Sequence, residues 1–395
     1  MNVKRLLSVV LAASAVGCAA CTSWVITPER SASGRMILHK CRDQHLNTLT
    51  AVIRNDGGVR WMCIGADGGA MFGLNEYGVA ATSNYGGKYF GPRPKKRKHG
   101  GSILDRVAVN AKDAATGAEL IRSCGRDGWR PSGGMFLVAD SKRAFVVEIG
   151  GAYGEMMEIP GGIYVISNSL HLGGCEAYFP GEAEKLMSHR AREAKTRAEL
   201  HKNEVGGKHT VEGVFKSSRL TGRFVPFNRF SLSAVSFELD AEFPEMLGCA
   251  YVALGPQQHT VYLPTPMALE QFPEDMQNGK WAARALALRM KLGDDHKYLP
   301  RIEAREKEFL SEFGTAREEA RILLRSGRRD EAKKLLNDTF ARHYARAKEL
   351  LRAIAEDAGV EADPPIMTRK DEEKLHKSIQ EKSPQKKSRK TRKTR

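Results

Sequence analysis

The sequence predicts an α+β protein in which β-sheets are packed together and covered by helices. Residues 21–265 contain many short runs rich in β-branched and aromatic residues, separated by Gly, Asp, Ser and Asn, which is typical of paired strands. Helical stretches interrupt these strand groups, and this alternation favours stacked sheets under helical layers. From about residue 268 the chain becomes helical and highly charged. We therefore expect four regions, at residues 1–20, 21–267, 268–360 and 361–395.

The expected strands come in groups along the second region. We place the first strands at 21–26, 35–41, 50–55 and 59–66, and two more within 69–84 that are joined through Asn75 to Gly78. A helical stretch follows over about 103–121, with Ser102 as its N-cap. Strand character returns at 135–140, 141–150, 154–160 and 162–168. A charged helix is expected over about 182–203, and the last strands at 232–239, 249–255 and 259–263.

The C-terminal third predicts a helical hairpin and a disordered basic tail. Apolar residues recur at helical spacing on both sides of Ser326–Gly327, which indicates two amphipathic helices. Their apolar stripes are expected to pack on the body of the protein or on each other. Beyond Pro365 the chain consists mainly of Lys, Arg, Ser, Gln and Thr, with almost nothing apolar, so we expect disorder over 361–395.

The formal net charge of +16 is concentrated in two segments. Residues 93–98 include five basic residues, and residues 369–395 include 12 basic and 4 acidic ones. The tail has no aromatic residue to stack on a base, so we expect no specific nucleic-acid partner. We expect the 369–395 segment to tether the protein loosely to an anionic envelope surface, with a merely solvated tail as the alternative.

Residues 1–20 have the features of a secretory signal peptide that ends immediately before Cys21. Two basic residues begin the segment, an apolar stretch follows, and small residues precede the cleavage site. Cleavage after Ala20 makes Cys21 the first residue, with a thiol nucleophile and an α-amine that can act as its base. We therefore expect an exported protein, periplasmic or extracellular. A lipoprotein anchored at Cys18 is the alternative, because residues 15–18 weakly resemble a lipobox.

The rest of the sequence gives no sign of a metal site, a cofactor or a disulfide framework. Cys18 and Cys21 have CxxC spacing, but the expected cleavage after Ala20 separates them, and no cluster of metal-ligating residues stands out in the sequence. We expect no metal and no cofactor, and disulfides are not indicated. No apolar run after the signal is long enough to span a membrane.

Five segments, in order, resemble a known family. The segments CTSW, GRMILHKCRD, GLNEYGVAATSN, MFLVADSKRAFVVEI and GIYVISNSLHL are similar to the N-terminal-nucleophile (Ntn) hydrolases of the choloylglycine hydrolase and acyl-coenzyme A:6-aminopenicillanate acyltransferase group. That group contains bile-salt hydrolases, penicillin V acylases and amidases similar to acid ceramidase. The resemblance covers about residues 21–265 and implies a four-layer αββα sandwich. The helical hairpin and the basic tail lie outside it.

The resemblance implies catalytic roles for residues at matching positions. Cys21 matches the nucleophile that forms an acyl-thioester. Asp43 matches the acid that holds and polarises the α-amine. The backbone N–H of Asn84 and the side-chain amide of Asn168 match the two donors to the oxyanion, each of which typically contributes about 2.7–4 kcal/mol of transition-state stabilisation.

Further residues are expected to provide charge or contact the substrate. Arg219 matches an arginine near the nucleophile, and Arg223 is the alternative equivalent. Lys40 stands where many relatives have arginine, and a lysine keeps the charge but loses the planar fork that can bind a carboxylate or carbonyl from two nitrogens. We expect Lys40 and Arg42 at the substrate. Trp24 is a further candidate for substrate contact, although core packing is the role that a tryptophan on such a strand more often has.

Together these features predict an exported amidase or acyltransferase. It would cleave a linear, non-peptide C–N bond in a small-molecule amide through an acyl-thioester. Water as the second reactant makes it a hydrolase, and an amine makes it an acyltransferase; the sequence does not choose between them. The alternatives are a peptidase-like member that acts on short peptides, and a non-catalytic envelope-associated protein that uses the fold as a scaffold. The sequence does not fix the oligomeric state.

Overall fold

The computed structural model describes residues 21–43, 48–66, 69–86, 102–126, 133–150, 153–172, 183–222, 224–227 and 231–366. The expected signal peptide with Cys18, the basic run at 93–98, Arg223 and the basic tail beyond residue 366 lie outside these residues. None of the described helices is both long and apolar enough to cross a lipid bilayer.

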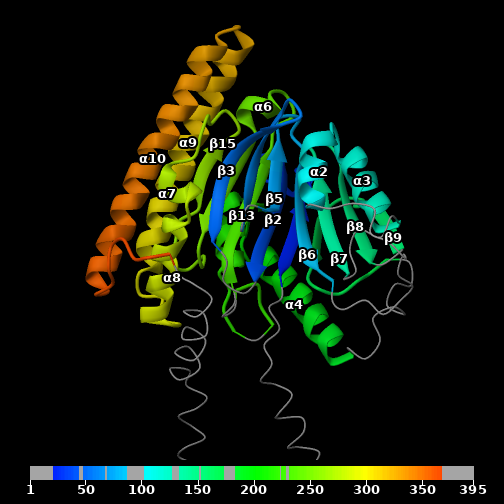
Figure 1. The fold of residues 1–395 in the computed structure, drawn as a ribbon, viewed down its shortest axis with the longest axis horizontal. Coiled ribbons are helices and arrows are strands. Elements are labelled where there is room, and N and C mark those ends of the chain that lie inside the picture. The colour runs from blue at the N-terminus through cyan, green and yellow to red at the C-terminus, as the bar shows by residue number, and fades with distance from the viewer. Residues whose placement is uncertain are drawn as a thin grey trace, which may run out of the picture.

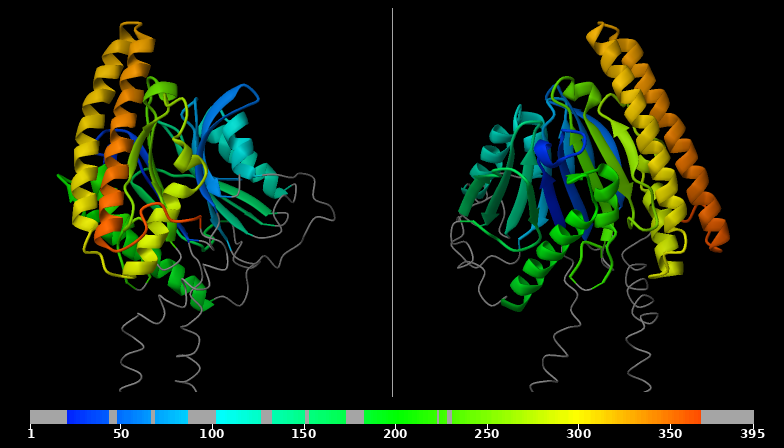
Figure 2. Two further views of the ribbon diagram at one scale, coloured as in Figure 1. Left: turned by 60° about the vertical axis from the view of Figure 1, so that its left-hand side comes forward. Right: turned by 180° about the vertical axis from the view of Figure 1, so that it is seen from behind.

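Two antiparallel sheets lie face to face in the middle of the protein (Figures 1 and 2). The described strands of the first sheet have the order β10-β1-β2-β13-β14-β15. Their bounds are Thr22–Ile26 for β1, Met36–Asp43 for β2, Ile163–Ile166 for β10, Ser231–Leu239 for β13, Cys249–Leu254 for β14 and Leu263–Pro266 for β15.

The second sheet is an antiparallel meander in which neighbours in sequence are neighbours in space. Its strands are β3 (Leu49–Asp56), β4 (Val59–Ala66), β5 (Gly69–Asn75), β6 (Ala80–Tyr85), β7 (Gly134–Ala139), β8 (Ala144–Gly150) and β9 (Tyr153–Glu158). Side chains from the facing surfaces of the two sheets, such as Val25, Leu38, Phe72 and Leu137, form one buried cluster between them. Alternate residues of each strand therefore face this inner core or an outer one.

Helices cover both outer faces. Helices α2 (Ile103–Asn110) and α3 (Ala114–Arg126) bury an apolar cluster against the second sheet. Helices α4 (Ala183–Lys202), α5 (Val211–Ser218), α9 (Leu299–Arg325) and α10 (Arg329–Asp357) lie on the side of the first sheet. The shorter elements are η2 (Pro28–Arg30), α6 (Pro244–Leu247), α7 (Glu274–Gln277), α8 (Lys280–Leu292) and the small hairpin β11 (Glu204–Val205) with β12 (Lys208–His209). The expected αββα sandwich is confirmed.

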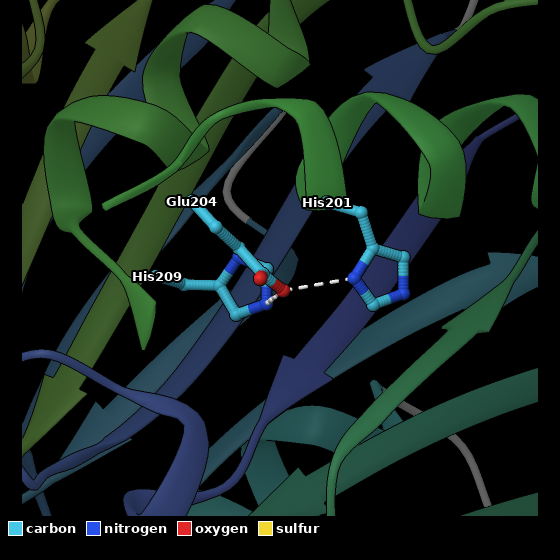
Figure 3. Close-up of side chains that lie close together, drawn as sticks. All are labelled: His201, Glu204 and His209. Atoms are coloured by element: carbon cyan, nitrogen blue, oxygen red, sulfur yellow. Dashed lines mark hydrogen bonds and ion pairs between the residues drawn. The ribbon is translucent and has the colours of Figure 1, made fainter. Parts of the chain in front are cut away.

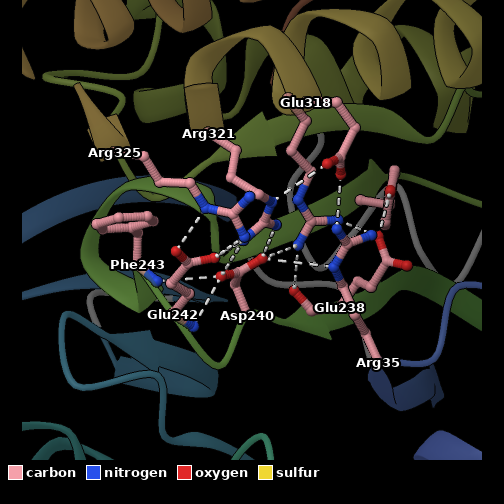
Figure 4. A network of polar contacts seen from close by, with 10 residues as sticks. Arg35, Glu238, Asp240, Glu242, Phe243, Glu318, Arg321 and Arg325 are labelled. Atoms are coloured by element: carbon pink, nitrogen blue, oxygen red, sulfur yellow. Dashed lines mark hydrogen bonds and ion pairs between the residues drawn. The ribbon is translucent and has the colours of Figure 1, made fainter. Parts of the chain in front are cut away.

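The α9–α10 hairpin forms part of the same body. It breaks at Ser326–Gly327, as the sequence predicted. Ile302 and Phe309 join the inner core, and Phe313 and Leu336 join the cluster outside the first sheet. Buried and half-buried ion pairs also join α9 to the end of β13 (Figure 4). The change in composition near residue 268 therefore does not separate two independent cores.

Two sequence expectations are corrected. The helical stretch at 103–121 is divided into α2 and α3, because the Asn75 side chain donates to the Ala108 and Ala111 carbonyls and Asp113 accepts from the Thr116 N–H to begin the next helix. The strand expected at 259–263 begins only at Leu263, because the chain after Gly255 turns instead of extending. The position of Ser102 as N-cap holds, although its hydroxyl donates to Ala70 O and makes no cap bond.

Candidate active site

Cys21 lies directly before β1, at the edge of the space between the two sheets. Along β1, Val25 belongs to the inner core and Trp24 to the outer one, so strand alternation directs Cys21 and Ser23 to the inner side. The Cys21 thiol is 6% exposed and its Sγ donates to Asp43 O at 3.7 Å. A nearly buried thiol therefore stands at the point where the expected mature chain begins.

Lys40 and Asn84 connect the two sheets beside this thiol. Lys40 lies opposite Ser23 in the register of β1 and β2, and Asn84 lies on β6 of the other sheet. The Lys40 ammonium donates to Ser83 O and, at 2.9 Å, to Asn84 Oδ1, which also accepts from Ser23 Oγ at 2.7 Å. Burial lowers the pKa of Lys40, and the nearby Cys21 thiol and its hydrogen bond oppose this shift.

Residues 167–171, which we call the Asn168 segment, follow β10 and also contact this cluster. Asn84 Nδ2 donates to Ser167 O at 2.8 Å, and Ser167 Oγ donates to Cys21 O at 3.3 Å. Asn168 Nδ2 donates one of its two N–H groups to Tyr85 O, and its buried Oδ1 has no hydrogen-bond partner. The second N–H of that amide is the group available to an oxyanion.

Glu193 and Arg192 of α4 support the Asn168 segment, and the sequence analysis missed both. Glu193 Oε1 accepts from the Ser167 N–H at 2.9 Å, from Ser169 Oγ at 3.0 Å and contacts His171 Nε2 at 3.1 Å. Arg192 Nη1 donates to Ser167 Oγ at 3.1 Å. Both side chains are buried. The charged helix pattern over 182–203 concealed them, because a glutamate in such a helix normally faces solvent.

Asp43 and Arg42 also lie at this end of β2. The Asp43 carboxylate is buried and accepts a hydrogen bond from Ser231 Oγ. Arg42 is buried too, and its charge is among the groups that lower the pKa of Lys40. Cys21, Lys40, Arg42, Asp43, Asn84 and Asn168, which lie far apart in the sequence, are therefore brought to one end of the sandwich.

Two of the predicted site residues occupy other surroundings. Arg219 is buried, with its Nη1 and Nη2 2.7 and 2.6 Å from the Glu306 carboxylate of α9 and its guanidinium 5.2 Å from the Tyr262 ring. Its role at the thiol stays a prediction. Trp24 is fully buried in the outer core and stacks on His39 with ring centroids 4.0 Å apart. The expected substrate contact of Trp24 is therefore corrected to core packing.

Another cysteine, Cys41, is paired with a histidine close by, but this pair is inert. His39 Nε2 is 3.4 Å from Cys41 Sγ, and both side chains are fully buried on the outer side of β2. Burial lowers the pKa of His39 well below its usual value and raises the pKa of Cys41 well above its own. Both groups stay neutral at pH 7, so this pair supplies no thiolate. The described cysteines 21, 41, 63, 124 and 249 form no disulfide bond with one another.

The surroundings of the cluster are described only in part. Residues 87–101, which follow β6, and 173–182, which follow the Asn168 segment, lie outside the described residues. A cavity of about 450 Å³ opens at the opposite end of β1, lined by residues that include Thr27, Met36 and Arg143. At about 3.3 Å per strand residue, Thr27 is roughly 20 Å from Cys21, so this cavity does not serve the thiol.

No protein-family model matches the chain, and no curated protein matches its sequence. Among solved structures, penicillin V acylase from Agrobacterium tumefaciens matches with 14% identity and a TM-score of 0.40, over 60% of this chain and 84% of that one. Two variants of the conjugated bile acid hydrolase from Clostridium perfringens match with 8% and 9% identity and TM-scores of 0.44 and 0.37, over 65% and 59% of this chain and 98% and 89% of theirs. The contacts around Cys21, and not these likenesses, carry the functional argument.

Proposed function

We propose that this protein is an exported amidase or acyltransferase that cleaves a linear, non-peptide C–N bond through an acyl-thioester on Cys21. The observation that carries the proposal is the arrangement around the Cys21 thiol. The thiol contacts the Lys40 ammonium and the Asp43 backbone oxygen, and the buried Asp43 carboxylate and the Asn168 amide lie at the same end of the sandwich. A single cleavage after Ala20 would make this cysteine the N-terminal residue. No other described cysteine has such surroundings.

The reaction begins when the α-amine of Cys21 takes the thiol proton. The sulfur attacks the carbonyl carbon of the amide, and the C=O electron pair moves to the oxygen. That oxyanion accepts hydrogen bonds from the second N–H of Asn168 Nδ2 and, as the resemblance implies, from the backbone N–H of Asn84. When the intermediate collapses, the C–N bond breaks and the leaving amine takes the proton from the α-ammonium. A thioester remains on Sγ.

The second half of the cycle regenerates the thiol. The α-amine takes a proton from water, the hydroxide attacks the thioester carbonyl, and the C–S bond breaks to release the carboxylic acid. The leaving sulfur takes the proton from the α-ammonium, which restores the thiol and the free amine. An amine in place of water gives a new amide by the same steps. Lys40 acts here as a positioning group, because its three N–H groups are directed to Ser83 O, Asn84 Oδ1 and the Cys21 sulfur. The resemblance implies that Asp43 holds the α-ammonium once the signal is removed.

The test uses the protein collected after export. Intact mass spectrometry should show a chain that begins at Cys21, and incubation with amides of increasing acyl length, each carrying a fluorogenic amine, should add one acyl mass and release the amine. Cys21→Ala should abolish both signals. A chain with one extra residue before Cys21 should lose them too, because its α-amine has become a non-basic amide.

The matched control is Cys63→Ala, which removes another nearly buried thiol whose pKa burial raises to about 11. It should retain acylation and turnover. Turnover by Cys21→Ala at the wild-type rate would refute the nucleophile assignment. Equal activity with and without the extra N-terminal residue would show that another group serves as the base.

A further inference from the structure

Three metal-ligating side chains meet where α4 ends and the small β11–β12 hairpin begins (Figure 3). We call His201, Glu204 and His209 the His–Glu–His cluster. His201 Nδ1 is 2.8 Å and His209 Nε2 is 3.0 Å from Glu204 Oε1, and one donor atom from each residue lies within 4.8 Å of the others. The turn at Gly206–Gly207, where both residues have positive φ, folds β12 back so that His209 faces Glu204.

The ring of His209 is oriented as a metal ligand would be. The side chain is 98% buried, since its relative exposure is 2%. A ring N–H is hydrogen-bonded to the backbone of Leu200, and Nε2 has no hydrogen-bond partner of acceptable geometry. The bond to Leu200 therefore belongs to Nδ1, which leaves the lone pair of Nε2 directed at Glu204. Metal-bound histidines almost always fix the other ring nitrogen in this way.

The ligand set and its exposure fit a first-row divalent ion. Two imidazoles and one carboxylate are a common set of three protein ligands for Zn²⁺, with water in the fourth position. His201 is half exposed, so an ion can enter from solvent. Arg30 of η2 lies 2.6 Å from Glu204 Oε1 and is 38% exposed. Its guanidinium neutralises the carboxylate in the metal-free protein and competes with an ion for it.

We propose that the His–Glu–His cluster binds a divalent transition-metal ion of the Zn²⁺ class. The ion displaces Arg30 and joins the end of α4 to the β11–β12 hairpin. The ion takes no part in the chemistry at Cys21, because the cluster lies beside η2, which follows the far end of β1 roughly 20 Å from Cys21. Its consequence for the rest of the protein passes through α4, the helix that carries Glu193.

The test is a metal titration of the chelator-treated protein with Zn²⁺ and Co²⁺. A Cys21→Ala background prevents the ion from binding to the Cys21 thiol. We expect one ion per chain, a tetrahedral Co²⁺ absorption spectrum, and a Tm raised by about 2 °C or more. His201→Ala removes a half-exposed ligand without disturbing the core and should weaken binding at least about 10-fold, and His209→Ala should do the same.

Two further variants separate a built site from incidental binding. Arg30→Gln should strengthen binding several-fold, because it removes the competing cation. His296 is a partly buried histidine elsewhere in the protein, and His296→Ala should leave the affinity for the ion unchanged. Unchanged affinity in His201→Ala and His209→Ala, or weaker binding in Arg30→Gln, would overturn the proposal and identify the ion as adventitious.

Discussion

Replacing Glu193 with alanine should slow the proposed acylation even though Glu193 does not touch Cys21. Its Oε1 is the common acceptor for Ser167 N–H, Ser169 Oγ and His171 Nε2, the residues on either side of Asn168. Each hydrogen bond to a charged group contributes about 1.5–3 kcal/mol, so the segment loses its strongest anchors together. The upper limit of the effect is the loss of the Asn168 donor itself, about 10²–10³ in kcat.

We therefore expect kcat to fall about 10²-fold in Glu193→Ala, with a much smaller change in KM. Glu193→Gln keeps an acceptor at the Oε1 position and loses only the charge, so its loss should be about 10-fold, since charged bonds are roughly twice as strong as neutral ones. The assay is release of the fluorogenic amine under saturating substrate, beside urea unfolding of each variant. Glu199→Ala, on the same helix but bonded to Asn203, is the matched control.

A double-mutant cycle decides whether Glu193 acts through Asn168. If it does, the variant with both Asn168→Ala and Glu193→Ala should be hardly slower than Asn168→Ala alone. If the rate loss in the double variant equals the product of the two single losses, the reasoning is refuted, because Glu193 then affects the reaction by another route.

Two predictions concern the ion pairs between α9 and β13 (Figure 4). Arg317→Ala leaves the buried carboxylate of Glu238 without its guanidinium partner. It should lower the free energy of unfolding, measured with urea, by about 3–5 kcal/mol. Arg325→Ala removes an exposed ion pair with Glu242 and should have a far smaller effect. An equal loss in the two variants would contradict this. The second prediction concerns acid stability. Burial alone would raise the pKa of Asp240, but hydrogen bonds from Arg321 and from the Phe243 N–H hold it well below its usual range. Because the pKa in the folded state is lower than in the unfolded state, this stabilisation is complete above about pH 4 and is lost as the pH falls further. Asp240→Asn should therefore lower the free energy of unfolding more at pH 7 than at pH 3. An equal loss at both pH values would show that ionisation of Asp240 does not contribute to stability.

The strands were predictable because their signal is local. Alternating and β-branched runs bounded by Gly, Asn and Asp located nearly every strand of the two sheets, and the Asn75–Gly78 turn fell where expected. The division of α2 from α3 was not predictable, because it depends on Asn75, which reaches the helix from another strand. The late start of β15 likewise follows from tertiary contacts, since Gln257 O and Thr260 O turn to accept from Arg219.

The candidate site was predictable where the ordered motifs carried it, and not where its supports came from elsewhere. Lys40, Asp43 and Asn84 lie on strands and Asn168 closely follows one, so the ordered motifs could name them by position. Glu193 lies in a helix whose composition suggests a solvated face, so only its burial in the structure reveals it. The His–Glu–His cluster was missed because its spacing matches no common motif until the glycine turn reverses the chain.

The Arg219–Glu306 ion pair determines how far the expressed chain can be shortened. Glu306 lies on α9, 87 residues after Arg219, and it also accepts from the Tyr262 N–H at 2.7 Å. A chain that ends at residue 267, where the charged helices begin, would bury the Arg219 guanidinium without its carboxylate and the Tyr262 N–H without an acceptor. It would also expose the apolar surface that Ile302 and Phe309 cover. The smallest piece that can fold as a unit therefore extends from Cys21 to the end of α10, and expression vectors or chimaeras that treat the sandwich as a separate module should yield insoluble protein.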